Sequence, residues 1–434
     1  MKLKILIIAD EVWNDDIHGN NILSNWFTGF NAEFAEIYCS PGIPKNYVCN
    51  RYFQITDSMM AKSFYGKKAG AAFDISIEQM QSNQSIHAEK IPVKFYSFMK
   101  SITGEGIRTV RDLLWLLGSY DKIELQKFIN EFNPDIVFCP RLLTPKLLRL
   151  EKIVSSMTKA PFVAFTADDE ASLKQLNYSL LYWIKRIWFR KAFKKHIKLY
   201  HHYFMFSEDQ AHDYLNKYKI STSTLFKAGD FKSKFEAKEV NNPIKLIYAG
   251  RLYCNRWKTL SEIAKAIKVI NANGIKMTLN IYTQEKVTNR HRKALMLGED
   301  IIINGPVKPE KLVEIYKKGD IALHVESFDK KFRYATRVSF STKIIDLMAS
   351  SCAILAICWD QHAGYQYLKK HNAAFCISDA EQIKSMLEKI VNNPQLIRTY
   401  SRKAFECGKI NHNNLLIENK IRNVFEKVIK LEGK

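Results

Sequence analysis

Long hydrophobic runs are missing from this chain of 434 residues. No apolar stretch approaches the ~18 residues that a helix needs to cross a bilayer, so we expect no membrane-spanning segment. The apolar run at 4–9, KILIIA, is short, is soon followed by acidic residues and lacks a small-residue cleavage site. We therefore interpret it as a buried first strand and not as a signal peptide.

Closely spaced cysteine pairs are also missing. The chain has eight cysteines and no CxxC motif, and several of them lie in apolar, strand-like runs. This pattern favours free thiols in a reducing cytoplasm over disulfides or a zinc site. The cysteines are Cys39, Cys49, Cys139, Cys254, Cys352, Cys358, Cys376 and Cys407.

Acidic residues are absent from 171–207. The segment LLYWIKRIWFRKAFKKHIKLYHHY inside it predicts a basic helix over 180–202. At helical spacing, one side gathers Trp188, Phe189, Ala192, Phe193 and Leu199. The opposite side gathers Arg190, Lys191, Lys194, Lys195 and Lys198. A helix of this kind can lie on an anionic membrane surface, and the alternative is a core-packed helix with a solvated basic face.

The remaining composition is that of a soluble globular protein, with 47% hydrophobic and 25% charged residues. The length implies two domains. The formal net charge of +22 implies an anionic partner, which can be nucleic acid, an anionic membrane or an anionic substrate. We expect no nucleic acid, because the chain has neither an aromatic RNA-binding signature nor a zinc module.

Short apolar runs alternate with helical patterns along most of the chain, which predicts an α/β fold with parallel sheets. We predict two doubly wound, Rossmann-like domains at 1–228 and 243–410 that face each other across a cleft. The first would carry an elaborated region at 45–125, and a helix at 411–434 would return to it. The polar segment 227–242 is the predicted linker.

The stretch 337–355, RVSFSTKIIDLMASSCAIL, predicts a polar loop, a helix and an apolar strand. Ser341 and Thr342 supply cap-type hydroxyls where the helix should begin. Lys343 stands in the first turn, where the helix dipole disfavours a cation unless an anion binds there too. Asp346 lies on the face of Thr342 about 5.4 Å further on, roughly the span from a diphosphate to a ribose. The stretch predicts a nucleotide site, and an ordinary helix with a solvated first turn is the alternative.

Three cations follow a predicted strand at 245–249. Arg251 comes directly after it, and Arg256 and Lys258 stand just before the next helix. This places them at the carboxyl end of a strand, where the start of the helix in 337–355 is also expected. Fixed cations stabilise the charge of a departing diphosphate, and arginine holds phosphate oxygens with two donors. A solvated basic loop is the alternative.

Three motifs follow one another in the second half. They are Gly250-Arg251-Leu252 with Arg256, the strand and loop 301–307 (IIINGPV), and 346–354 (DLMASSCAI), which is similar to E-x-M-A-x-G-x-P-V. In this order and spacing they resemble the donor domain of two-Rossmann (GT-B) nucleotide-sugar glycosyltransferases, close to glycosyltransferase family 4. The resemblance covers about residues 243–392 well and the first domain loosely.

The resemblance implies a role for each matched position. The main chain around Gly305 and Val307 would hold the base of the donor nucleotide, and Asp346 would hold its ribose. The implied diphosphate contacts are Arg251, Arg256, Lys258, Ser341, Thr342 and Lys343. The resemblance also implies that the protein needs no metal and no other cofactor.

The sequence departs from the family pattern at the donor sugar. Many members carry a first Glu eight residues before the second, and Val338 stands at that position here. Glu326 is the predicted replacement, with Arg337 as the alternative. Catalytic candidates lie in the first domain, because an inverting transferase needs a general base for the proton of the acceptor. These candidates are Asp16, His18, Asp168 and Asp169, and the alternative is a structural histidine beside solvated acids.

We therefore expect an enzyme that moves a sugar from a nucleotide-diphosphate sugar to a glycan or a lipid-linked acceptor in bacterial surface polysaccharide synthesis. Its expected place is the cytoplasm, or the inner face of the cytoplasmic membrane as a peripheral protein. The alternatives are a nucleotide-sugar epimerase or hydrolase of the same fold, a nucleic-acid-binding protein and a non-catalytic relative.

Overall fold

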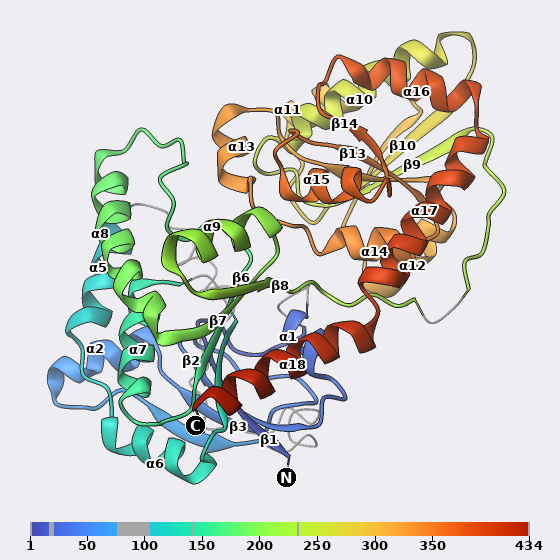
Figure 1. Ribbon diagram of the computed structural model, residues 1–434. Coiled ribbons are helices and arrows are strands. Elements are labelled where there is room, and N and C mark those ends of the chain that lie inside the picture. Colours follow the sequence, from blue (N-terminus) through green and yellow to red (C-terminus); the bar gives the residue numbers. More distant parts are fainter. Residues whose placement is uncertain (1, 17–20, 76–104, 141–142, 232–233, 433–434) are drawn as a thin grey trace. The chain divides into compact units, whose positions relative to one another are not determined.

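The computed structural model describes residues 2–16, 21–75, 105–140, 143–231 and 234–432 (Figure 1). The chain divides into two compact units. The first comprises Met1–Leu173, Asn177–Leu225 and Ile417–Lys434, and the second comprises Lys174–Leu176 and Phe226–Leu416. Each unit is built on one sheet, so the predicted α/β fold with two Rossmann-like domains is confirmed. The segment 227–242, predicted as a linker, belongs to the second unit.

The first unit has a sheet with the strand order β4-β3-β2-β1-β5-β6-β7-β8. Its neighbours pair in parallel, except that β3 and β4 pair antiparallel. The strands are β1 (Leu3–Ala9), β2 (Ala32–Tyr38), β3 (Arg51–Gln54), β4 (Ala71–Asp74), β5 (Ile136–Pro140), β6 (Phe162–Thr166), β7 (Tyr200–Met205) and β8 (Ser221–Thr224). Strands β3 and β4, which belong to the predicted elaborated region 45–125, therefore extend the sheet at one edge.

Helices cover this first sheet. They are α1 (Ile22–Phe27), α2 (Asp57–Lys62), η1 (Ser63–Tyr65), α5 (Glu105–Leu117), α6 (Lys122–Phe132), α7 (Pro145–Ser155), α8 (Leu180–His196), η2 (Ile197–Leu199), α9 (Glu208–Tyr218) and α18 (Asn414–Glu432). The last helix returns to the first unit as predicted, because the ring of Phe425 packs on Phe138 at 5.6 Å and Arg422 lies over the ring of Phe30. The basic helix ends at His196 and not at 202, since β7 begins at Tyr200.

The second unit has a fully parallel sheet with the order β11-β10-β9-β12-β13-β14. Its strands are β9 (Ile244–Ala249), β10 (Met277–Tyr282), β11 (Ile301–Asn304), β12 (Ile321–Val325), β13 (Ala353–Ile357) and β14 (Phe375–Ile377). Strand β13 is apolar throughout and buried throughout, as expected of a central parallel strand with helices on both faces.

The helices of the second unit connect these strands. They are α10 (Arg256–Ile270), η3 (Asn271–Asn273), α11 (Asn289–Leu295), α12 (Pro309–Lys317), α13 (Lys330–Thr336), α14 (Lys343–Ala349), α15 (Ala363–Lys370), α16 (Gln382–Asn392) and α17 (Gln395–Asn411). In the part of the chain that the structure describes, every helix is too short or too polar to cross a bilayer.

Candidate functional site

The strand order of the second unit locates its candidate site. From β9 the chain proceeds outward to β10 and β11, and then returns to β12 on the other side of β9. Adjacent parallel strands whose connections leave in opposite directions open a crevice at their carboxyl ends, and ligands bind there in this class of sheet. Arg251 and Arg256 follow β9, and Glu326 follows β12. The predicted diphosphate cations therefore lie at the switch point of the sheet.

Arg256 is held by a two-pronged ion pair. Its Nη2 and Nε atoms donate to the two carboxylate oxygens of Glu326 at 2.8 and 2.9 Å. Both side chains are largely buried, with 16% and 6% of their surfaces exposed. The hydroxyl of Thr259 donates to the main-chain oxygen of Glu326 at 2.9 Å and fixes this residue further. The pair sets the guanidinium in one orientation at the carboxyl edge of the sheet.

Lys343 extends from α14 to the same point. Its Nζ donates to the main-chain oxygen of Ala249, the last residue of β9, at 3.1 Å. A Cβ atom on Gly250 would come within 3.3 Å of this Nζ, so the residue after β9 leaves space for the lysine. Desolvation and repulsion by Arg256 and Arg251 lower the pKa of Lys343. A cation whose charge is disfavoured in this way gains free energy when an anion binds beside it.

One aromatic ring lies beside both arginines. The guanidinium carbons of Arg251 and Arg256 lie 5.8 and 4.9 Å from the ring centre of Tyr253. The hydroxyl of Tyr248 donates to the main-chain oxygen of Arg251 at 2.7 Å, which fixes the turn after β9. Arg251, Arg256 and Lys343 thus form one cationic cluster around the end of β9.

Lys258, the other predicted diphosphate contact after β9, is engaged elsewhere. Its Nζ lies 2.9 Å from Asp329, which also accepts from the side-chain amide of Asn255 at 2.5 Å. Burial alone would raise the pKa of Asp329, but the two hydrogen bonds outweigh it and lower that pKa. Like Arg256, Lys258 is paired with a carboxylate, so it adds less positive charge to this region than Arg251 does.

The start of α14 differs from the capping expected for it. Thr342 is the N-cap residue, yet its hydroxyl makes no cap hydrogen bond, and the helix has seven residues. Ser341 and Thr342 are partly buried beside Lys343. The carboxylate of Asp346, predicted to hold the ribose, pairs with Lys227 at 2.7 Å. The positive charge near the start of α14 therefore comes from side chains. The roles assigned to Ser341, Thr342 and Asp346 stay predictions.

The predicted base-binding loop lies at the same edge of the sheet. Gly305 and Val307 follow β11, which is two strands from β9. Strands lie ~4.8 Å apart, so the ends of β11 and β9 are separated by about 10 Å. Gly305 is exposed and open space surrounds it. A nucleotide laid along this edge could place its base at β11 and its diphosphate at β9.

The sugar-reading position has no free carboxylate in this arrangement. Val338, which replaces the expected Glu, is buried with 3% of its surface exposed. Glu326, the predicted replacement, is bound to Arg256 by both oxygens. The recognition of a donor sugar by Glu326 therefore requires sharing or loosening of this ion pair.

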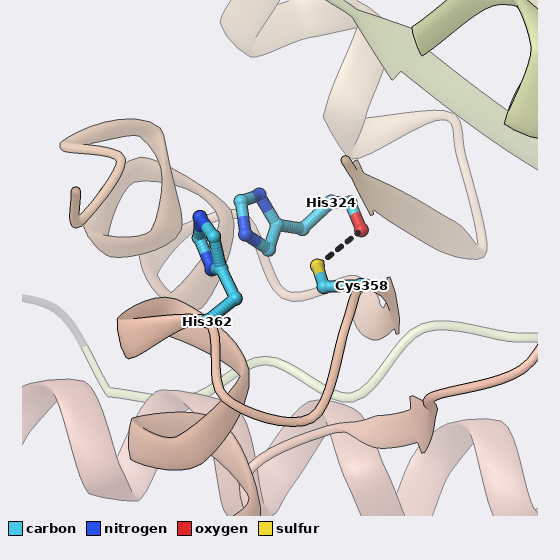
Figure 2. Close-up of side chains that lie close together, drawn as sticks. All are labelled: His324, Cys358 and His362. Carbon is cyan, nitrogen blue, oxygen red and sulfur yellow. Dashed lines mark hydrogen bonds between the residues drawn. The ribbon is translucent and has the colours of Figure 1, made fainter. Parts of the chain in front are cut away.

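Three buried side chains gather next to this edge, at the ends of β12 and β13 (Figure 2). Ligand-type atoms of His324, Cys358 and His362 lie within 4.8 Å of one another, and His324 Nε2 has no hydrogen-bond partner among the described residues. Burial lowers the pKa of both histidines and raises that of the thiol, so all three are neutral near neutral pH. Nδ1 of His362 accepts from the N–H of Gly364 at 3.2 Å and caps α15. Its proton is therefore on Nε2, which leaves this ring no lone pair for a metal in this arrangement.

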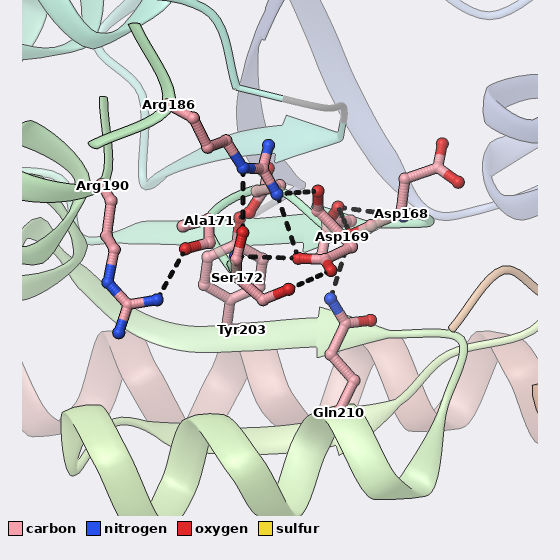
Figure 3. Close-up of polar contacts among 10 residues, drawn as sticks. Asp168, Asp169, Ala171, Ser172, Arg186, Arg190, Tyr203 and Gln210 are labelled. Atoms are coloured by element: carbon pink, nitrogen blue, oxygen red, sulfur yellow. Dashed lines mark hydrogen bonds and ion pairs between the residues drawn. The ribbon is translucent and has the colours of Figure 1, made fainter. Parts of the chain in front are cut away.

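The acidic loop after β6 is tied down by α8 (Figure 3). Arg186 donates to the side chain and the main-chain oxygen of Asp169 at 3.3 and 2.9 Å, and to the main-chain oxygen of Ser172 at 2.9 Å. Asp169 also accepts from the main-chain N–H of Ser172 at 2.9 Å. The carboxylate of Asp168 points away from this network (Figure 3). Asp169 is therefore held within this loop by α8, and the catalytic roles of Asp168 and Asp169 stay predictions.

The other catalytic candidates follow β1. The carboxylate of Asp16 is exposed and pairs with Lys45, and its main-chain N–H donates to the side chain of Asn14 at 3.0 Å. His18 lies outside the described residues. The strands before Asp16 and Asp168 are separated by one strand, β5, or about 10 Å at the sheet edge. Their roles stay predictions.

The basic helix α8 is oriented differently from the expected pattern. Phe193 is buried as expected, but Trp188, placed on the same side by helical spacing, is half-exposed. Arg190 is partly buried, and its guanidinium donates to the main-chain oxygen of Ala171 at 3.1 Å. The four lysines at 191, 194, 195 and 198 are exposed. Arg190 thus belongs to the packing of the unit and not to its outer basic surface.

Several site residues were not found from the sequence. Lys227 and Asp329 become relevant only because they pair with Asp346 and Lys258, which lie 119 and 71 positions away. Tyr253 could have been found, since it stands between the two arginines of one motif. The signal was an aromatic ring within reach of both cations.

No family model matches the chain, and no curated protein matches it in sequence. Solved structures do match in fold. Sucrose-phosphate synthase from Thermosynechococcus elongatus has a TM-score of 0.63 at 12% identity, covering 99% of this chain and 100% of that one. HepE from Anabaena, solved in complex with UDP, has a TM-score of 0.62 at 10% identity, covering 98% and 100%. The trehalose-6-phosphate synthase OtsA has a TM-score of 0.59 at 11% identity, covering 97% and 98%. In fold, the chain is therefore similar over its whole length to GT-B glycosyltransferases.

Proposed function

We propose that the protein is a glycosyltransferase that uses a nucleoside-diphosphate sugar, with UDP as the first nucleotide to test. The observation that carries the proposal is the cluster of Arg251, Arg256 and Lys343 at the switch point of the second sheet. Support for UDP comes from the similar structures, since HepE was solved with UDP and, in a second structure, with UDP and glucose.

The cluster suits the chemistry of this transfer. When the bond between the anomeric carbon and the β-phosphate oxygen breaks, its electron pair stays on the phosphate, and cations fixed beforehand stabilise the added charge. The proton of the acceptor hydroxyl goes to a base, for which Asp16, His18 and Asp168 are the candidates, or to the departing phosphate itself. The base of the nucleotide would lie on Gly305–Val307 and the ribose on Asp346. A metal ion is not part of this proposal.

The proposal names the acceptor by its chemical class and not as a single compound. A glycan or a lipid-linked sugar in surface polysaccharide synthesis fits the expected place of the protein in the cytoplasm or at the inner face of the membrane. Family 4 membership is part of the same proposal, and it rests on the order of the motifs at 250–256, 301–307 and 346–354.

Thermal unfolding in the presence of UDP, GDP, ADP and CMP tests the donor site. A nucleotide at 100 times its dissociation constant adds ~2.7 kcal/mol to the unfolding free energy, which is a readily measured rise in melting temperature. Arg251→Ala should remove the rise, because it takes away a cation of the cluster. The variant should still fold, because Arg251 is exposed and its loss leaves no buried charge behind. Lys311→Ala, which removes an exposed cation from α12, is the matched control and should keep the rise. The absence of a rise with all four nucleotides would refute the donor site.

A nucleotide-binding protein without transferase activity is the second candidate. The buried Val338 and the engaged Glu326 favour it, because both remove a carboxylate from the sugar position. Release of UDP from UDP-sugars, with and without a glycan acceptor, distinguishes the two. Nucleotide binding without any such release would favour this second candidate.

A further inference from the structure

The outward face of α8 is divided along its length. Its first half is apolar, with five side chains that are each 41–76% exposed. They are Leu180, Leu181, Ile184, Ile187 and Trp188. Its second half is basic, with exposed lysines at 191, 194, 195 and, in η2, 198. At 100° per residue these nine positions fall within an arc of about 140°, so they form one face.

Other polar side chains of α8 lie on its inward face, where they make contacts within the first unit. Phe193 is buried, His196 bonds to the buried Glu151 at 2.7 Å, and Arg186 and Arg190 hold the loop after β6. The four exposed lysines form no ion pair within the part of the chain that the structure describes. They are therefore not required for the packing of α8.

Helix α5 lies beside α8 and also exposes apolar side chains. Lys185 of α8 pairs with Asp112 of α5 at 2.9 Å, which brings the two helices together. Four apolar side chains of α5 are 48–68% exposed. They are Val110, Leu113, Leu116 and Leu117. The exposed apolar side chains of both helices and the four lysines are named the α5–α8 surface.

We propose that the α5–α8 surface docks on an anionic lipid bilayer. The apolar side chains would enter the boundary between headgroups and acyl chains, with Trp188 at the depth that tryptophan prefers, and the lysines would contact anionic headgroups. A bilayer is favoured over nucleic acid because nine of the thirteen side chains of this surface are apolar, and a polyanion in water does not cover them. A bilayer is also favoured over a protein partner. The charged side chains of α8 are all positive, since 171–207 contains no acid, and they match a uniformly anionic surface. This inference does not rest on the donor site.

Co-sedimentation of the full chain with vesicles tests the electrostatic half. We expect binding to vesicles that contain phosphatidylglycerol, weaker binding at high salt, and little binding to phosphatidylcholine alone. Replacement of lysines 191, 194, 195 and 198 by Ala should weaken the binding at least ~100-fold, since each cation at such a surface contributes about 1 kcal/mol. The matched control replaces the exposed lysines 268, 276, 293 and 409 of the second unit by Ala and should weaken it less than about fivefold.

Fluorescence tests the apolar half. Vesicles that carry brominated acyl chains should quench part of the tryptophan emission, and Trp188→Phe should remove that quenched part while the other six tryptophans remain. Ile184→Ser with Ile187→Ser should reduce binding at high salt, where the lysines contribute least. All variants should keep the melting temperature and the UDP response of the parent chain, which separates this surface from the donor site.

Three outcomes would overturn the inference. They are equal binding of the two fourfold lysine variants, the absence of quenching by brominated lipid, and binding to RNA or heparin by a chain that does not bind anionic vesicles. The last outcome would assign the surface to a polyanion in place of a bilayer.

Discussion

At the scale of single residues, the donor unit holds its cations with contacts that a bound anion would change. Arg256 is paired with a buried carboxylate, whereas the ammonium of Lys343 donates to a main-chain oxygen. Arg251 is exposed. Arg256 is thus a fixed cation, while Arg251 and Lys343 can adjust to a ligand.

The first prediction concerns the buried pair. Arg256→Ala leaves the carboxylate of Glu326 buried without its counter-charge, and removing one partner of such a pair costs ~3 kcal/mol of unfolding free energy. Arg256→Met combined with Glu326→Leu should recover most of this loss, because it leaves no unpaired charge. Urea denaturation measures both. The double variant should still bind UDP poorly, and a double variant as unstable as the single one would contradict the account.

The second prediction concerns pH. The pKa of Lys343 is lowered, and binding of a diphosphate favours its charged form. The affinity for UDP should therefore fall as pH rises through the titration of this lysine, and the fall should begin below the pH at which an ordinary lysine titrates. Calorimetric titrations from neutral to alkaline pH measure it. Lys343→Arg should flatten the profile and Lys311→Arg should not; identical profiles for both would contradict the assignment.

Sequence reasoning located the residues of this site only in part. Arg251, Arg256 and Lys343 could be predicted because each lies at a strand end or a helix start, which are features of local pattern. The partners of Arg256 and Asp346 could not, since they are 70 and 119 positions distant and meet only through the sheet order. Trp188 was grouped with Phe193 on one side of its helix, but it stands at the border of that side and is half-exposed.

At the scale of elements, the turn between β9 and α10 is closely packed. A Cβ atom on Gly250 would lie 2.8 Å from the hydroxyl of Tyr248 and 3.3 Å from Nζ of Lys343. The hydroxyl of Tyr248 must therefore move when a side chain is added there, and Nζ of Lys343 must shift by a few tenths of an ångström.

The third prediction follows from this turn. Gly250→Ala should displace Lys343 and weaken UDP binding about tenfold or more, an effect of ~1.4 kcal/mol. The fold should remain, because the clash is with the ends of side chains. Gly106→Ala in α5 is the control, since nothing lies within 4 Å of its added Cβ atom. Calorimetry measures both affinities, and unchanged binding by the Gly250 variant would show that the position of Lys343 is unimportant.

The fourth prediction concerns strand β2 and stability. Glu36 is fully buried there, and burial raises its pKa from 4.5 to about 8, although the N–H of Trp13 donates to it at 3.1 Å. Between these two values the folded chain keeps a proton that the unfolded chain has lost, so the unfolding free energy falls as pH rises. Glu36→Gln should therefore stabilise the protein near pH 8, by on the order of 3 kcal/mol, and much less near pH 4.5. Urea denaturation at both pH values, with the exposed Glu33→Gln as control, measures this; an equal effect at both would contradict it.

Helices and strands could be predicted where one sequence feature, such as a continuous apolar run, was strong. Continuous apolar runs such as β13 identified buried parallel strands without ambiguity. In the segment 45–125 the strands β3 and β4 were not predicted, because they are short and extend one edge of the sheet. The end of α8 was placed too late, since LYHHY continues the helical pattern although β7 begins at Tyr200.

At the scale of the whole molecule, each unit is a complete doubly wound sheet with its own switch point. The chain shares this plan over its full length with glycosyltransferase structures at 10–12% identity, so the plan survives when few residues are shared. The net charge of +22 has two local explanations in this account, the cations around β9 and the lysines of the α5–α8 surface. Both were suggested by sequence, which already placed them in different predicted domains, and in the structure they lie in different units.

The central claim is that the end of β9 binds a diphosphate. The most direct test compares the dissociation constants of UDP and UMP, by calorimetry, for the parent chain and for Arg251→Ala. The account predicts that the parent binds UDP at least about tenfold more tightly than UMP, a difference of ~1.4 kcal/mol, and that Arg251→Ala removes most of this ratio. Equal affinities of the parent for UDP and UMP, or a ratio that Arg251→Ala leaves unchanged, would contradict it.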